Sequence, residues 1–392
     1  MDEIRLSIII WCLPYGFGPS SKALTLANEL TDWHDVTIVT YGDSIYFVRN
    51  SVKYINVTVI DAGSRSNICN TLMDIKSQKD VNLFISIMDY NVFDDINSCF
   101  KDIRFVFFDM LWGWRKLCFN SSVIDLILIE KDPVIEQNAN KLIDEIHESV
   151  SIRGTISVCD TLLVKKQLIR KALSSQNGNR ILINLGGVSS PRLKMEDNKA
   201  IIALMDWLFN IVCDDKAFEF VISGNNWLNK LSLSLGRQWP VVMPYPHDEF
   251  LELLLHCECI FTVPSLGIIH ESLSYNKNPI LLPPICVSQA MHYSVYISSG
   301  FYGLASTKLL GYIDNILDHG INFDAYKATT IMETAILKNI DELTNHFNSC
   351  LIRHNNCKQY SILDSILTKT RNQGFVEFMT VIDEFISRNS WK

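Results

Sequence analysis

The 392-residue sequence has no excess of basic residues. Its 35 Lys and Arg residues are outnumbered by 43 Asp and Glu residues, which gives a formal net charge of −8 at pH 7. Broad binding to nucleic acid requires a basic surface, so this charge balance argues against it. A charged fraction of 20% and an apolar fraction of 48% are typical of a globular protein, not of a disordered one.

Closely spaced cysteines are scarce. Among the eleven cysteines only Cys257 and Cys259 lie close together, and no C-x-x-C pair occurs. The pattern therefore supports neither a zinc ribbon nor a disulfide framework, and it favours free thiols in a reducing compartment. No group of His, Cys, Asp and Glu has the spacing of a metal site, so we expect no bound metal and no cofactor.

Long apolar runs are also missing. No stretch approaches the length of about eighteen apolar residues that a membrane-spanning helix needs. The short run from Leu6 to Leu13 leads into Gly16 without a small-residue cleavage site, which favours a buried first strand over a signal peptide. We therefore predict a soluble, cytoplasmic protein. We also find no solenoid repeat and no low-complexity tract.

What the sequence does contain is a regular alternation of short apolar runs with helical segments, which predicts doubly wound α/β sheets. The expected strands are 6–12, 36–41, 54–60, 83–88, 104–109, 123–129, a last strand with a turn at 152–155, then 180–185, 219–222 and 241–243. The expected helices include 20–30, 197–212, 250–256, 340–351, 360–369 and 375–386.

The length is sufficient for two domains. The polar, turn-rich stretch 174–179 is the best candidate linker between them. We therefore predict an N-terminal Rossmann-like domain over 1–170, a second Rossmann-like domain over 178–340, and C-terminal helices over 341–392.

The first loop, which contains Gly16, Gly18 and Ser20, admits several interpretations. It is no Walker loop, because no glycine precedes Lys22 at the required spacing. It lacks the third glycine of a dinucleotide fingerprint, although Asp43 would be a passable acidic partner. The glycines would let the backbone approach a bound group, or they merely permit a tight turn. Lys22 is a candidate point charge for a phosphate.

Two carboxylates end predicted strands of the first domain, at Asp89 and Asp109. Ligands of doubly wound sheets lie outside the carboxyl ends of strands, so both are candidate catalytic residues. Asp109 is followed by Trp112 and Trp114, and aromatic faces beside an acid suit a sugar or another polyol. The alternative is an Asp that caps a helix and tryptophans that fill a core.

The stretch from Phe261 to Gln289 is the most informative part of the chain. It reads as a buried strand, a small-residue turn, a helix, a second strand and a Pro-rich loop. Ser265 is a candidate helix cap, and the N–H groups at Gly267 and Ile268 would form a seat for phosphate. Glu271, one turn later, can accept two hydrogen bonds from the hydroxyls of a ribose, provided that its carboxylate stays accessible.

Other residues of the second domain support a nucleotide site. Gly186 and Gly187 directly follow a predicted strand, so their N–H groups are a second candidate contact for phosphate or sugar. Tyr245 is a candidate to pack against a nucleobase. An equally good alternative is that the Pro-x-Pro sequence around it only forms a rigid turn, with no role in binding. His270 neighbours Glu271 on a helix, where adjacent side chains diverge, and a core or surface histidine is the commoner case.

The run LGIIHESLSYNKNPILLPP, followed by Gln289, resembles the donor-binding segment of GT-B glycosyltransferases. It is similar to the UDP-glycosyltransferases and to the peptidoglycan N-acetylglucosaminyltransferase. The matching positions are Gly267, Glu271, Leu273, Pro279, Pro283 and Gln289. The chain departs from the family pattern, which has His-Gly-Gly, Thr, Asp and Asn, at Val263, Pro264, Ser265, Ile268, Ser288 and His292.

The resemblance implies a GT-B architecture, in which two Rossmann-like domains face a cleft and C-terminal helices cross back toward the first domain. It implies metal-independent transfer of a sugar from a nucleotide-sugar donor, such as a UDP-sugar, to a small-molecule or glycan acceptor. The catalytic His that many of these enzymes carry in the first loop is absent here.

The resemblance also implies roles for single residues. The donor would contact Gly186, Gly187, Tyr245, Ser265, Gly267, Ile268, Glu271, Gln289 and His292. The acceptor side would include Gly16, Gly18, Ser20, Lys22 and Trp112. We expect Asp109 to be the base that deprotonates the acceptor, and Asp89 and Lys22 are the alternative candidates for this role.

Three alternatives stay open. One is a nucleotide-sugar hydrolase or epimerase on the same scaffold, and another is a non-catalytic binding or partner-activating subunit. A nicotinamide-dependent oxidoreductase would need one strong dinucleotide fingerprint, and the chain instead spreads weak Gly-rich turns over two domains. The sequence also leaves a homo-oligomer open.

Overall fold

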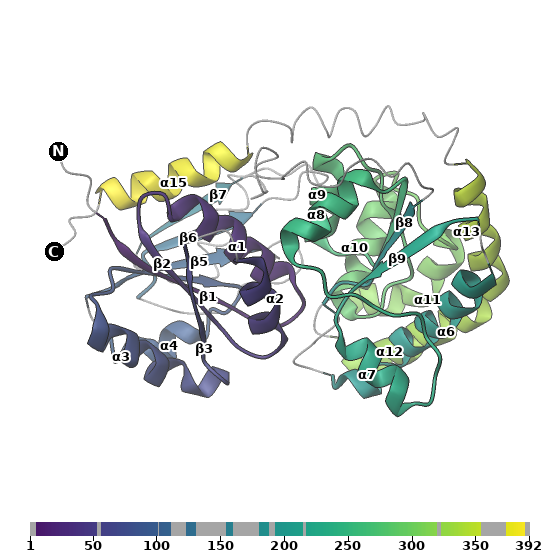
Figure 1. The fold of residues 1–392 in the computed structure, drawn as a ribbon, viewed down its shortest axis with the longest axis horizontal. Helices are drawn as coiled ribbons and strands as arrows, with labels where there is room; N and C mark the ends of the chain where they lie inside the picture. The colour runs from purple at the N-terminus through teal and green to yellow at the C-terminus, as the bar shows by residue number, and fades with distance from the viewer. Residues whose placement is uncertain are drawn as a thin grey trace. The chain divides into compact units, whose positions relative to one another are not determined.

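The computed structural model describes residues 5–52, 56–100, 102–110, 123–130, 154–159, 180–187, 193–214, 217–319, 323–353 and 374–388. The chain forms two compact units (Figure 1). The first comprises Met1–Val164 together with Lys369–Lys392, and the second comprises Lys165–Thr368. Each unit is built on its own parallel sheet.

The first sheet has seven strands in the order β3-β2-β1-β4-β5-β6-β7, and every neighbouring pair is parallel. These strands are β1 (Ser7–Cys12), β2 (Asp35–Thr40), β3 (Thr58–Asp61), β4 (Leu83–Ile87), β5 (Arg104–Asp109), β6 (Leu126–Glu130) and β7 (Thr155–Cys159). The helices of this unit are α1 (Gly18–Leu30), α2 (Asp43–Ser51), α3 (Ile68–Gln78), α4 (Val92–Ile96) and α15 (Gly374–Arg388).

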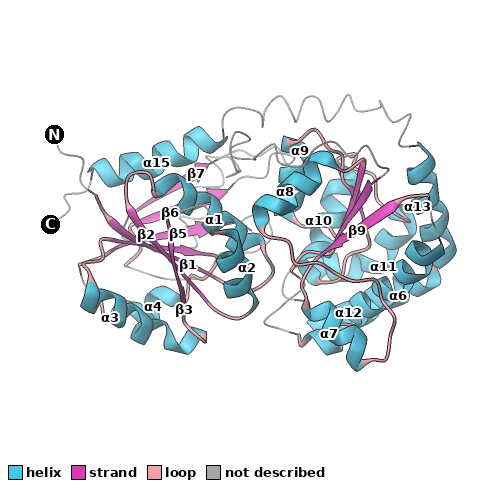
Figure 2. Cartoon of the chain, viewed as in Figure 1, coloured by secondary structure: helices cyan, strands magenta, loops and turns pink. Residues whose placement is uncertain are grey.

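Helices cover both faces of the first sheet, which is why its strands read as continuous apolar runs. On one face, Ile8 and Ile10 of β1 pack in a core that also contains residues of α1, α2 and α15. On the other face, Ile9 and Trp11 pack in a core with residues of α3 and α4. Figure 2 shows the two helical layers on either side of the strands.

The second sheet has four parallel strands in the order β11-β10-β8-β9. These strands are β8 (Arg180–Asn184), β9 (Glu219–Ser223), β10 (Cys259–Thr262) and β11 (Ile280–Leu281). The helices of this unit are α6 (Lys199–Asp214), α7 (Trp227–Ser234), α8 (His247–His256), α9 (Leu266–Ser274), α10 (Val287–Ser298), α11 (Ser306–His319), α12 (Ala325–Lys338) and α13 (Ile340–Arg353).

The helices near the C-terminus divide between the two units. In α13, Phe347 is fully buried and stacks on Phe261 of β10, with ring centroids 4.3 Å apart, so this helix belongs to the second unit. In α15, Ile382 is fully buried in the core of the first unit. Within the predicted segment 341–392, α13 thus belongs to the second unit and α15 to the first, and the expected helix at 360–369 lies outside the described residues.

The α/β class with two parallel sheets agrees with the prediction from the sequence, and most strand bounds differ by only one or two residues. β3 starts four residues later than expected, and β7 starts at Thr155, where we expected a strand to end. A Cβ atom at Gly154 would lie 1.6 Å from the carbonyl oxygen of Asp125, so this glycine permits the close approach with which the strand begins. The predicted strand at 241–243 is reduced to a single bridge between Met243 and Ser223. The predicted linker at 174–179 lies outside the described residues.

Candidate functional site

Each sheet has a topological switch point, where the chain leaves the central strands in opposite directions. In the first sheet it lies between β1 and β4, and in the second sheet between β8 and β10. In open α/β sheets, ligands bind in the crevice outside the carboxyl ends of the strands at such a point. The residues that follow β8 and β10, and those that follow β1 and β4, are therefore the candidates for ligand contact.

The start of α9 lies directly after β10 at the switch point of the second sheet. Ser265 is the N-cap residue, as predicted, but its hydroxyl accepts no hydrogen bond from the helix. The first N–H groups of a helix have no partner within the helix. A Cβ atom at Gly267 would meet no heavy atom within 4 Å, so there is space beside this first turn. Backbone N–H groups and the positive end of the helix dipole together suit an anion such as phosphate.

The turn after β8 lies beside the residue that follows β10. Gly186 has a φ of +65°, a left-handed conformation that glycine adopts without steric cost. A Cβ atom built on Gly186 would be 3.8 Å from Cγ2 of Val263. The predicted phosphate contacts at Gly186 and Gly187 therefore belong to the same end of the second sheet as the start of α9.

Buried asparagines fix the shape of this turn. Asn184 donates from Nδ2 to Oγ1 of Thr262 at 3.0 Å, and its Oδ1 accepts from the N–H of Gly186 at 3.3 Å. Asn225 donates from Nδ2 to the carbonyl oxygen of Gly187 at 3.2 Å. Neither asparagine is among the residues predicted for the site, although a polar residue that ends a buried strand, such as Asn184, is a usable signal.

Glu271 is less accessible than its predicted role requires. Only 9% of the residue is exposed, and its Oε1 lies 2.8 Å from Nε2 of His247, the first residue of α8. Tyr275 is four residues further along the chain, and burial raises the pKa of its phenol, with a further increase from the charge of Glu271. The carboxylate thus belongs to a buried polar cluster of its own unit, so the accessibility on which its predicted role depends is largely lost.

Two predicted contacts of the donor sugar bind the protein's own backbone instead. Gln289 accepts at Oε1 from the N–H of Ile285 at 3.0 Å, and His292 places Nδ1 3.2 Å from the carbonyl oxygen of Pro264. Both side chains are buried. Because Asn198 also donates to the carbonyl oxygen of Ile285, at 3.1 Å, we assign Gln289 and Asn198 to holding the Pro-rich loop in place.

The remaining predicted residues of this unit differ in exposure. Tyr245 is half-buried, and burial raises the pKa of its phenol. The side chain of Ile268 is buried, so only its backbone is a candidate contact. His270 is buried, with Nε2 3.5 Å from the hydroxyl of Tyr296, which agrees with a core histidine.

In the first unit, two residues predicted to line the acceptor side are buried. Lys22 forms an ion pair with Glu130 at the end of β6, with Nζ 2.5 Å from Oε1, and the two side chains are 3% and 2% exposed. Ser20 is fully buried and donates to the hydroxyl of Ser44 at 2.8 Å. Neither side chain presents a polar group at the surface, because each is satisfied inside the unit. Gly16, in the loop after β1, and Gly18, the first residue of α1, are partly exposed.

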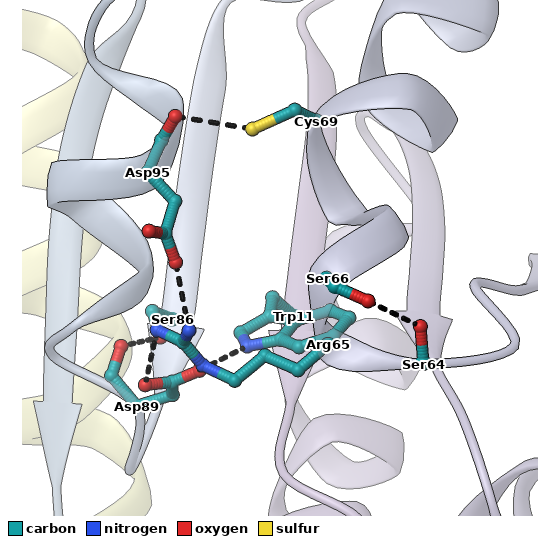
Figure 3. Close-up of polar contacts among 8 residues, drawn as sticks. All are labelled: Trp11, Ser64, Arg65, Ser66, Cys69, Ser86, Asp89 and Asp95. Carbon is teal, nitrogen blue, oxygen red and sulfur yellow. Dashed lines mark hydrogen bonds and ion pairs between the residues drawn. The ribbon is translucent and has the colours of Figure 1, made fainter.

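Asp89 is part of a polar network at the switch point of the first sheet (Figure 3). Its carboxylate accepts from Nε1 of Trp11 at 3.0 Å and from Nε of Arg65 at 2.9 Å, and Arg65 also pairs with Asp95 at 2.8 Å. These donors engage the carboxylate of Asp89, so its geometry favours a structural role over the predicted catalytic one. The residue before it, Met88, has a φ of +70°, a costly conformation for a residue other than glycine.

Asp109 ends β5, as predicted, but it has no exposed surface. A base must come within hydrogen-bond distance of the group that it deprotonates, and the described arrangement does not offer Asp109 to a ligand. Trp112 lies outside the described residues. Among the described residues, no group of three or more His, Cys, Asp or Glu side chains is placed to hold a metal ion. None of the described helices is long and apolar enough to cross a membrane.

Neither a protein-family model nor a curated protein matches this sequence. Several solved structures are similar to it along most of its length. UGT89C1 of Arabidopsis thaliana in complex with UDP-L-rhamnose has a TM-score of 0.46 and 10% identity, over 94% of this chain and 99% of that one. UGT71G1 of Medicago truncatula in complex with UDP-glucose has a TM-score of 0.44 and 12% identity, over 94% of this chain and 99% of that chain. A protein assigned as a UDP-N-acetylglucosamine 2-epimerase from Listeria monocytogenes has a TM-score of 0.47 and 10% identity, over 91% of this chain and 98% of that chain.

Proposed function

We propose that the second unit binds a nucleotide-sugar donor and that the protein transfers its glycosyl group to a small-molecule or glycan acceptor. The observation that carries this proposal is the pairing of two backbone features at one switch point. The glycine turn after β8 lies beside the open start of α9. The first N–H groups of α9, with the glycine turn after β8 beside them, suit the phosphates of a nucleoside diphosphate.

The chemistry of transfer makes use of this arrangement. The acceptor oxygen forms a bond to the anomeric carbon, the bond from that carbon to the diphosphate breaks, and the proton of the acceptor passes to a base. Negative charge develops on the departing diphosphate as the bond breaks. Fixed N–H groups and the dipole of α9 stabilise that charge without reorganisation during the reaction.

The sequence of the segment supports the choice of nucleotide. Its match at Gly267, Glu271, Pro279, Pro283 and Gln289 is to a pattern of UDP-glycosyltransferases. We therefore propose a UDP-sugar as the donor. The carboxylate of Glu271 is the group of that pattern that would accept a hydrogen bond from a ribose hydroxyl, although here it is buried and lies against His247.

The nucleotide assignment is tested by calorimetric titration with UDP, dTDP, GDP, CDP, ADP and the matching nucleotide sugars. A ligand at 100 times its dissociation constant raises the free energy of unfolding by about 2.7 kcal/mol, which a thermal-shift assay detects. Glu271→Gln keeps an acceptor for His247 but loses the charge, and we expect it to weaken nucleotide binding about tenfold or more. The control is Glu249→Gln, an exposed glutamate in the first turn of α8. Absence of binding by every nucleotide would refute the proposal.

Binding of the donor without transfer is the second candidate. It is favoured by the burial of Asp109 and by the ion pair of Lys22, since these were the predicted base and its reserve. The two candidates differ in turnover. Release of nucleoside diphosphate from a bound nucleotide sugar, with glycan and small-molecule acceptors supplied, supports transfer, whereas release without any acceptor supports a hydrolase. Tight binding with no release supports the non-catalytic alternative.

A further inference from the structure

Two of the free cysteines lie where helices α3 and α4 meet, on one face of the first sheet. Cys69 is the second residue of α3, and Cys99 follows the end of α4 by three residues. Both side chains pack against the core that these two helices share, and Figure 1 shows the helices next to one another. Both are partly exposed, whereas Cys257 and Cys259, the cysteines closest in sequence, are buried. Cys69 and Cys99 are therefore accessible to a small oxidant in solution.

A hydrogen bond fixes the Cys69 thiol at the end of α4. Sγ of Cys69 donates to the carbonyl oxygen of Asp95 at 3.0 Å, as Figure 3 shows. In a continued α-helix this carbonyl group would face the N–H of Cys99, four residues later. The N–H of Cys99 bonds instead to the carbonyl oxygen of Ile96 at 2.9 Å, which makes a tighter last turn. The Cys69 thiol thus lies beside the turn that carries Cys99.

The two thiols act on one another. Burial raises the pKa of the Cys69 thiol, and Cys99 raises it further through its charge and as a side-chain hydrogen-bond partner. A side-chain hydrogen bond requires the two sulfur atoms to be neighbours. A disulfide forms without backbone movement only between cysteines whose side chains already meet in the folded chain. Cys69 and Cys99 meet this condition, although residues 70–98 separate them in the sequence.

We propose that Cys69 and Cys99 are a dithiol site that glutathione disulfide, or a similar small disulfide, oxidises reversibly to an intramolecular disulfide. The inference is independent of the proposed function, because it uses no residue of the second unit. The bond joins α3 to the end of α4 and closes a loop that contains β4, the neighbour of β1 at the switch point. It also removes the S–H donor of the Asp95 carbonyl oxygen, and Asp95 is an ion-pair partner of Arg65.

The exchange balances in two steps. The Cys99 thiolate attacks one sulfur of glutathione disulfide, one glutathione leaves, and a mixed disulfide remains on Cys99. Cys69 then loses its proton and attacks the Cys99 sulfur, and the second glutathione leaves. The two protein thiols lose two electrons, their protons pass through solvent to the leaving groups, and one glutathione disulfide becomes two molecules of glutathione. The first attack falls to Cys99 because the carbonyl oxygen of Asp95 holds the proton of Cys69.

The test uses the wild-type protein in buffers with defined ratios of reduced to oxidised glutathione, with free thiols blocked by N-ethylmaleimide before digestion. Trypsin cleaves after Arg65, Lys76, Lys79 and Lys101, so peptides 66–76 and 80–101 each carry a single cysteine. Mass spectrometry without reduction detects the cross-link between these peptides. We expect it to exceed every other intramolecular cysteine pair about tenfold or more, and to disappear with dithiothreitol.

Controls separate a built pair from random oxidation. The same oxidation in concentrated urea should remove the preference, because the folded chain brings the two thiols together. Cys69→Ser should trap glutathione on Cys99, whereas Cys213→Ser, at an exposed cysteine of the second unit, should leave the cross-link unchanged. The inference is overturned if both thiols stay reduced in oxidised glutathione alone, if both carry glutathione without a cross-link, or if the cross-link is as frequent in urea as in buffer.

Discussion

Lys22 and Glu130 illustrate how a single buried pair affects stability. Removal of one member leaves the other charge buried and unpaired, which costs about 3–5 kcal/mol. We expect Lys22→Met to lower the free energy of unfolding by an amount of this order, because the Glu130 carboxylate is almost fully buried. Urea denaturation with a linear extrapolation measures the change.

The matched control for that substitution is Lys194→Met, at an exposed lysine of the second unit, which we expect to change stability little. The double variant Lys22→Met/Glu130→Leu replaces both charges with apolar groups and should recover much of the loss. Strictly additive losses in the double variant would show that the two charges do not stabilise one another.

The buried thiols make stability depend on pH above neutrality. Burial raises the pKa of Cys12 and of Cys257 from 9.0 to about 11. Between these values the unfolded chain releases a thiol proton that the folded chain keeps, so stability is full below pH 9 and falls as pH rises toward 11. We expect the free energy of unfolding to decrease from pH 8 to pH 10, and to decrease less in Cys12→Ala. An equal decrease in that variant would contradict the contribution of Cys12.

Alkylation gives an independent check of the same two thiols. A thiol that is buried and protonated reacts slowly, because the thiolate is the nucleophile. At pH 8 we expect iodoacetamide to modify the exposed Cys213 and to spare Cys12 and Cys257, as read by mass spectrometry of peptides.

Side-chain partners distant in sequence were the part of the site that could not be predicted. The identity of Asp89 as a strand-ending carboxylate was visible in the sequence, but its role follows from Trp11 and Arg65, which lie 78 and 24 residues away. Likewise Glu271 was identified by its place in a motif, while His247 was not. A motif gives residue types along the chain, whereas burial and pairing are set by how helices pack.

At the scale of the element, substitutions at the N-terminus of α9 provide the sharpest test of the proposed phosphate-binding site. Gly267 has open space where a side chain would be, and so does Gly311 in α11. Replacing a helical glycine by alanine stabilises a helix by about 0.5–1 kcal/mol. Both Gly267→Ala and Gly311→Ala should therefore raise thermal stability.

The two variants should differ in ligand binding. A methyl group at Gly267 lies beside the N–H groups that we assign to the diphosphate, so we expect weaker binding of UDP and of pyrophosphate. Gly311→Ala should leave both affinities unchanged. Calorimetric titration measures the affinities and thermal unfolding the stabilities. A Gly267→Ala protein that is more stable and binds UDP as the wild type does would rule out this helix start as the phosphate seat.

The bounds of helices and strands were easier to predict from the sequence than the side-chain contacts between them. A strand buried on both faces is a continuous apolar run, and β1, β4 and β5 were predicted to within one residue. The start of α9 was predicted from Ser265, although the expected capping hydrogen bond is absent. β7 was misplaced because Gly154 was read as a turn, and its actual role, a close approach to Asp125, depends on a strand that is about thirty residues away in sequence.

At the scale of the whole molecule, the chain order does not follow the division into units. The last described helix, α15, completes the core of the first unit, while the preceding α13 belongs to the second. Ile382 lies against a sheet whose strands are all encoded in the first 159 residues. The first unit therefore needs the C-terminal segment for its full stability, and truncation before α15 would expose apolar residues of that core.

Matched substitutions in these two helices test the division. Both Ile382 and Phe347 are fully buried, and truncation of such side chains to alanine costs about 2–5 kcal/mol through the lost contacts and the cavity left behind. Ile382→Ala should reduce protection against hydrogen exchange mainly in peptides from β1, β4 and β5, and Phe347→Ala mainly in peptides from β8, β9 and β10. Mass spectrometry of peptides after native-state exchange resolves the two patterns, because local and global openings are read segment by segment. If Ile382→Ala instead reduced protection chiefly in β8 to β10, the assignment of α15 to the core of the first unit would be wrong.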